Sequence, residues 1–124
     1  MQEARKWLPA TRDRMELRRH ALKLRYWPNP STSDASGSVL DLDWEWIRGL
    51  PGMRIGELRI HDTIGGHNNL RIIFFVADRA PHGGELPCIW ILSVFQKKRN
   101  DLTAAQLANF KARRTIILER FYGS

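Results

Sequence analysis

Cysteine is almost absent from this chain, because Cys88 is the one cysteine among 124 residues. A disulfide within the chain is therefore excluded, and such scarcity is typical of proteins in a reducing compartment. No segment is apolar over the length that crosses a bilayer, and the N-terminal residues lack the apolar stretch of a signal peptide. We therefore expect one cytoplasmic domain over residues 1–124, without a membrane partner.

The sequence also lacks the patterns that hold metals and nucleotide cofactors. Its four histidines and single cysteine do not have zinc-ligand spacing, and its carboxylates are not clustered as magnesium ligands. It contains neither a Walker-type glycine loop nor a nucleophile elbow of the form Gly-x-Ser-x-Gly. We therefore predict that the protein uses no cofactor and no metal.

Positive charge, in contrast, is abundant, and the net charge is +7. Residues 1–26 hold eight basic and three acidic side chains, residues 27–53 hold one and four, and residues 54–124 hold eleven and six. A balance of this size favours a polyanionic partner, which could be RNA, DNA or an acidic protein. The acidic middle predicts that the two basic ends meet that partner.

The N-terminal part predicts a helical arm followed by a loop. Residues 11–26 contain neither Gly nor Pro, and Leu17, Ala21 and Leu24 fall on one helical face. The prolines that follow end the helix. The composition of residues 28–38, which are rich in Ser and Pro, predicts a flexible loop.

The central part predicts a sheet. Residues 40–46 alternate apolar and acidic side chains, which is typical of a half-buried strand with an acidic outer face. A short helix through Trp44, Ile47 and Arg48 is the alternative. Three further segments are strand-like, and their short connections favour an antiparallel meander. These segments are residues 54–61, 70–78 and 88–97.

The C-terminal part predicts a helix over residues 103–121. Thr103 and Gln106 have capping-box spacing, and an apolar stripe runs along one side of the segment. The expected fold class is therefore α+β, with an N-terminal helical arm, an antiparallel β-sheet of about four strands, and a C-terminal helix packed on the sheet.

Strand alternation also predicts which charged side chains gather. Glu57 and Arg59 point to the same side of their strand. In simple hairpin register Arg59, Arg71 and Lys97 converge at the polar edge of one sheet face. The alternative is that Glu57 pairs with one arginine while the other charges are solvated. We expect Arg71 and Lys97 at surface positions that the core does not need.

Further candidates lie in the loops and on the last helix. Lys98 and Arg99 continue the basic run that begins at Lys97, and such a run suits phosphate contacts or a solvated turn. His67 lies in a loop of Gly and Asn, where an imidazole can transfer protons near neutral pH or be idle. Arg113 lies off the apolar stripe and is a candidate RNA contact.

The order of three motifs is familiar. Residues 56–60 read Gly-Glu-Leu-Arg-Ile, residues 69–74 read Asn-Leu-Arg-Ile-Ile-Phe, and residues 91–98 read Ile-Leu-Ser-Val-Phe-Gln-Lys-Lys. This ordered set resembles the RelE/ParE toxin superfamily, and most of all its phage-derived, HigB-like branch. The resemblance covers roughly residues 50–122. Leu70 departs from it, because the family usually has tyrosine there.

The resemblance implies a ribosome-dependent endonuclease of messenger RNA, which a cognate antitoxin protein holds inactive. It implies that Arg71 acts at the scissile phosphate and that Lys97, Lys98 and Arg99 form the basic end of the last strand. The family often has a lysine or histidine between its first two motif strands, where His67 lies here. Tyr122 is similar to C-terminal aromatic residues that contact the RNA.

Two other functions remain open at this point. One is the ParE-like branch of the same fold, which inhibits DNA gyrase without cleaving nucleic acid. The other is a non-catalytic nucleic-acid-binding module. Arg71 and the basic run 97–99 together favour the nuclease, since fixed positive charge stabilises the phosphorane of RNA cleavage.

Overall fold

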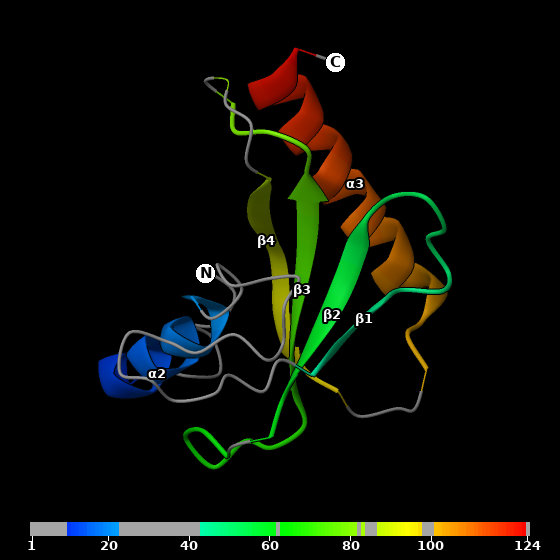
Figure 1. Ribbon diagram of the computed structural model, residues 1–124. Coiled ribbons are helices and arrows are strands. Elements are labelled where there is room, and N and C mark those ends of the chain that lie inside the picture. Colours follow the sequence, from blue (N-terminus) through cyan, green and yellow to red (C-terminus); the bar gives the residue numbers. More distant parts are fainter. Residues whose placement is uncertain are drawn as a thin grey trace.

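The computed structural model describes residues 10–22, 43–61, 63–81, 83, 87–97 and 101–123. Its centre is an antiparallel sheet in the order β1-β2-β3-β4. A helix lies on each side of this sheet, α2 (Thr11–Leu22) on one and α3 (Ala104–Tyr122) on the other (Figure 1). The predicted α+β fold is therefore confirmed.

The four strands are close to those that the sequence predicts. They are β1 (Trp44–Trp46), β2 (Ile55–Ile60), β3 (Leu70–Ala77) and β4 (Cys88–Gln96). The helical alternative for the first of these segments is wrong, because residues 44–46 pair with β2. The remainder of that predicted strand (40–42), the end of the predicted arm (23–26) and the predicted loop 28–38 lie outside the described residues.

Alternation along the strands divides the core into two halves. On the α2 side, Leu17 of the helix packs with Leu58, Ile72 and Phe74 of the sheet. On the α3 side, Phe110 packs with Ile73 and other residues of the sheet. Burying apolar surface on both faces holds both helices to the sheet.

A β-bulge lies in β4 opposite residues 73 and 74 of β3. Ile73 pairs with Ser93 while Phe74 pairs with Ile91, so Leu92 is the extra residue. Its carbonyl accepts a hydrogen bond from the Arg113 guanidinium of α3. An extra residue in one strand changes which side chains share a face. The bulge lets Leu92 join the core under α3.

The start of α3 is fixed by the predicted capping box. The amide of Gln106 donates to Thr103 Oγ1 at 3.1 Å, and the amide of Thr103 donates to Gln106 Oε1 at 2.9 Å. Two amides that the first helical turn leaves unpaired are thereby satisfied. Within the described residues, neither helix is long and apolar enough to span a membrane.

Candidate functional site

Three cations converge on one carboxylate at the α3 side of the sheet. Glu57 Oε1 lies 3.5 Å from Arg71 Nε, 3.5 Å from Lys97 Nζ and 3.9 Å from Arg59 Nε. We call these four residues the Glu57 cluster. The predicted convergence of Arg59, Arg71 and Lys97 is therefore confirmed, and the carboxylate that gathers them is its centre.

The register of the sheet explains why these side chains meet. Arg59 of β2 pairs with Arg71 of β3, and Glu57 pairs with Ile73. Residues paired across strands point to the same face, as do residues two apart along a strand. Lys97 follows β4 and prolongs its ladder, since its amide donates to the carbonyl of Asn69 at 2.8 Å. Three strands thus contribute to one face.

The cluster is mostly buried. The side chain of Glu57 is 4% exposed, and those of Arg71 and Lys97 are 14% and 17% exposed. Arg71 and Lys97 are therefore partly buried at the polar edge of this sheet face, and they are less exposed than the typical surface residue that the sequence suggested. Arg71 Nε is buried and has no hydrogen-bond partner among the described residues, because its contact with Glu57 at 3.5 Å is an ion pair without hydrogen-bond geometry.

Arg59 differs from the other two cations because it has carboxylate partners of its own. Its guanidinium donates to Asp43 Oδ1 at 3.0 Å and also to Glu45 of β1. Burial works against its charge, but the hydrogen bond to Asp43 and the charges of Glu45, Asp43 and Glu57 outweigh it and raise the pKa of Arg59. Asp43 also contacts His61, with Nε2 and Oδ2 2.8 Å apart. The positive charge of Arg59 is thus largely compensated by its own carboxylate partners.

A pocket of about 420 Å³ opens beside the cluster. Glu57 and Lys97 form part of its wall. The loop after β1 and the segment before α3 supply the other walls. The remaining charged residues that line it are Glu45, Arg48 and Asp101. An open pocket with convergent charges is a common feature of a binding or catalytic site.

His67 is not brought into the cluster. Its Nδ1 lies 3.2 Å from Gln96 Oε1. Gln96 pairs with Leu70, whose side chain belongs to the α2-side core, so Gln96 and Lys97 point to opposite faces. The imidazole therefore contacts the other side of β4. Its predicted catalytic role stays a prediction.

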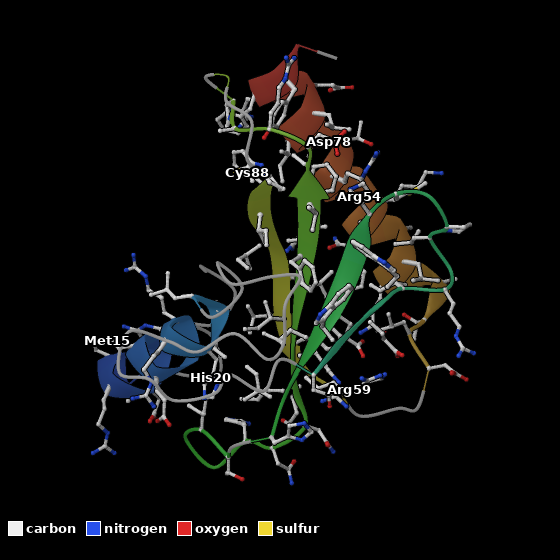
Figure 2. The ribbon with its side chains drawn as sticks, viewed as in Figure 1. Met15, His20, Arg54, Arg59, Asp78 and Cys88 are labelled. Carbon is white, nitrogen blue, oxygen red and sulfur yellow. The ribbon has the colours of Figure 1, made fainter. Side chains whose placement is uncertain are left out.

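Arg113 and Tyr122 also lie apart from the cluster. Arg113 donates to the backbone of β4. The Tyr122 hydroxyl donates to the carbonyl of Arg79 at 2.7 Å and accepts from Trp90 Nε1 at 3.1 Å. Figure 2 shows Asp78, the neighbour of Arg79, at the end of the sheet opposite Arg59. Lys98 and Arg99 lie outside the described residues. The RNA-binding roles of all four residues stay predictions.

Sequence reasoning missed the central role of Glu57 and the pocket residues Arg48 and Asp101. Strand alternation placed Glu57 on the same face as Arg59. That pattern indicates an ion pair with one cation, and it does not indicate a carboxylate shared by three. The pocket forms between segments that are far apart in the chain, so neither Arg48 nor Asp101 carries a local signal.

The described residues contain no group of three or more His, Cys, Asp or Glu side chains arranged to hold a metal ion.

Comparison of the chain with family models, curated proteins and solved structures gave no match. The resemblance to RelE/ParE toxins therefore rests on the ordered motifs alone.

Proposed function

We propose that this protein is the cytoplasmic toxin of a type II toxin–antitoxin pair, and that it cleaves messenger RNA on the ribosome without a metal. The observation that carries the proposal is the position of the Glu57 carboxylate, 3.5 Å from both Arg71 and Lys97 at the wall of an open pocket. A proton acceptor beside two cations suits attack of a 2′-hydroxyl on its phosphate.

In the proposed reaction, Glu57 takes the proton of the 2′-hydroxyl while the 2′-oxygen attacks phosphorus. Arg71 and Lys97 stabilise the negative phosphorane that forms. The bond from phosphorus to the 5′-oxygen then breaks, and this oxygen takes a proton from the Lys97 ammonium. The products are a 2′,3′-cyclic phosphate and a 5′-hydroxyl. Transfer of the proton from Glu57 back to Lys97 restores the site.

The neutralised Arg59 has a different part in this proposal. Its guanidinium is occupied by Asp43 and Glu45, so it does not need to contact phosphate. Its Nε lies 3.9 Å from Glu57 and helps to hold the carboxylate in place. Arg59 is therefore proposed as a positioning residue, and Arg71 and Lys97 as the residues that meet the scissile phosphate.

The proposed partners follow from charge. A chain with net charge +7 attracts both messenger RNA and an acidic protein, and the cognate antitoxin is proposed as the second. Electrostatic attraction makes association with the antitoxin fast and sensitive to salt.

The test is a reconstituted translation reaction in which cleavage sites on the message are mapped by primer extension. Wild-type protein should cut the message only during translation. Lys97→Met and Arg71→Gln should each lower the cleavage rate by about 10²-fold, as loss of one transition-state donor commonly does. Lys111→Met, at an exposed position of α3, is the matched control.

Intact messages while translation continues would contradict the proposal. Intact messages in cells whose growth is arrested by the protein would instead support the gyrase-directed function of the ParE-like branch.

A further inference from the structure

We propose that the pocket beside Glu57 and Lys97 binds a guanine base, so that the protein cleaves RNA next to guanosine. The inference rests on the proposed function for its place in a reaction. The binding itself can be tested without any cleavage.

The pocket has the size and walls that a flat base requires. Its volume of about 420 Å³ lies within the range of small-ligand sites, ~300–1,000 Å³. Ile47, Leu102 and Leu107 supply apolar surface against which a ring can pack. Gly49 allows the loop after β1 to approach α3 closely, because a Cβ at this position would lie 2.7 Å from Leu107 Cδ1.

Two of its charged residues remain available to a ligand. Glu45 is occupied by Arg59, and Glu57 faces its three cations. Asp101 and Arg48 line the same pocket and are exposed. Neither makes a side-chain hydrogen bond or ion pair with another residue in the part of the chain that the structure describes. The carboxylate of Asp101 offers hydrogen-bond acceptors, and the guanidinium of Arg48 offers donors.

Guanine is the base that satisfies both residues fully. Its N1–H and 2-amino groups are adjacent donors, which a carboxylate such as Asp101 accepts together. Its O6 and N7 are adjacent acceptors, which an arginine such as Arg48 contacts in bidentate fashion. Adenine, cytosine and uracil each place an acceptor beside their donor, so a carboxylate paired with them meets a lone pair. Guanine is therefore selected for two reasons. It makes contacts with both residues, and any other base would leave polar groups of the pocket unpaired.

The position of the pocket ties the base to the reaction. Glu57 and Lys97 belong both to the pocket wall and to the Glu57 cluster. A base held in the pocket therefore belongs to a nucleotide that adjoins the scissile phosphate. The choice of cleavage site would then follow from Asp101 and Arg48, which lie outside the reacting group.

The experiment measures binding of short 2′-O-methyl RNA, which cannot be cleaved, by fluorescence anisotropy. Three oligonucleotides differ at one position, which is guanosine, inosine or adenosine. Guanosine should bind about tenfold more tightly than inosine, which lacks the 2-amino group, and adenosine should bind more weakly still. Guanosine 5′-monophosphate at about 10 mM should compete, because the pocket admits a single nucleotide.

Two variants assign the contacts. Asp101→Asn should abolish the difference between guanosine and inosine. A fourth oligonucleotide carries 7-deazaguanosine, which lacks N7 and should bind wild-type protein more weakly than guanosine, and Arg48→Gln should abolish this difference. Asp78→Asn and Arg120→Gln change the same charges at exposed positions away from the pocket, and should keep both preferences.

The outcomes separate the two proposals. Selective guanosine binding by a protein that never cleaves messages supports the pocket and contradicts the nuclease. Cleavage with equal binding of all three oligonucleotides overturns the pocket assignment, as does failure of the monophosphate to compete. Retained guanosine selectivity in both pocket variants also overturns it.

Discussion

Lys97 Nζ lies 3.5 Å from Glu57 Oε1, although the two residues are forty positions apart and belong to segments that do not pair with each other. β3 lies between them and contributes Arg71 to the same carboxylate oxygen. The contact therefore exists only once three segments of the sheet have assembled. Folding and formation of the site are the same event at this position.

Glu57→Gln should destabilise the protein strongly. The variant keeps the size of the side chain but leaves partly buried cations without their shared, buried counter-charge, which typically costs about 3 kcal/mol. Urea denaturation measures the loss in unfolding free energy. Glu119→Gln, on the exposed side of α3, is the matched control and should change stability by about 0.5 kcal/mol or less. Adding Lys97→Met to Glu57→Gln should recover about 1 kcal/mol, since one unpaired charge is removed.

Gly56→Ala should destabilise the α2-side core. An added Cβ would lie 2.4 Å from Cζ of the fully buried Phe74 ring, so the ring or the strand must move. Overpacking of this kind costs about 2 kcal/mol. Thermal unfolding of Gly56→Ala, Phe74→Leu and the double variant measures the coupling. If the clash is the cause, the double variant loses clearly less than the two single variants combined.

Tyr122→Phe should change how stability depends on alkaline pH. Burial raises the pKa of Tyr122 above 10.0, and the hydrogen bond from Trp90 lowers it by less. The unfolded chain therefore loses this proton first. The stability from the hydroxyl is complete below its unfolded pKa and is lost as the pH rises through the folded pKa.

At neutral pH the phenylalanine variant should be about 1 kcal/mol less stable, because the hydrogen bonds to Arg79 and Trp90 are lost. Urea denaturation from about pH 8 to about pH 11 gives the difference between the two proteins. This difference should shrink at the alkaline end. A difference that stays constant would contradict the assigned role of the hydroxyl.

Arg113→Met separates a structural role from RNA binding. The guanidinium donates to the carbonyl of the bulge residue Leu92, so its loss should lower stability by about 1.5 kcal/mol. The cleavage rate of the folded variant should be unchanged. Arg120→Met, at an exposed position of α3, is the control for the loss of one positive charge. Weaker RNA binding by a variant of normal stability would instead support the RNA-contact role that the sequence suggested.

The sequence by itself determined the elements of the fold and much of the candidate site. Period-two alternation predicted the strand that contains β1, strand-like composition predicted β2, β3 and β4, and the capping-box spacing of Thr103 and Gln106 predicted the start of α3. All three signals depend on residues close together in the chain. Short connections predicted the antiparallel order. That order, with alternation, was enough to predict that Arg59, Arg71 and Lys97 meet.

Only the tertiary structure decided how the charges are shared and which of them are buried. The arrangement of the Glu57 carboxylate among three cations depends on the register of the strands, on the position of β1 at the edge of the sheet and on the cover that α3 provides. None of these is a local property of the sequence. The face that His67 contacts follows from its pairing with Gln96, and the end of the sheet that Tyr122 reaches follows from the length of α3. Asp101 and Arg48 share a pocket because two distant segments fold over the same strands, and sequence spacing has no means to record that contact.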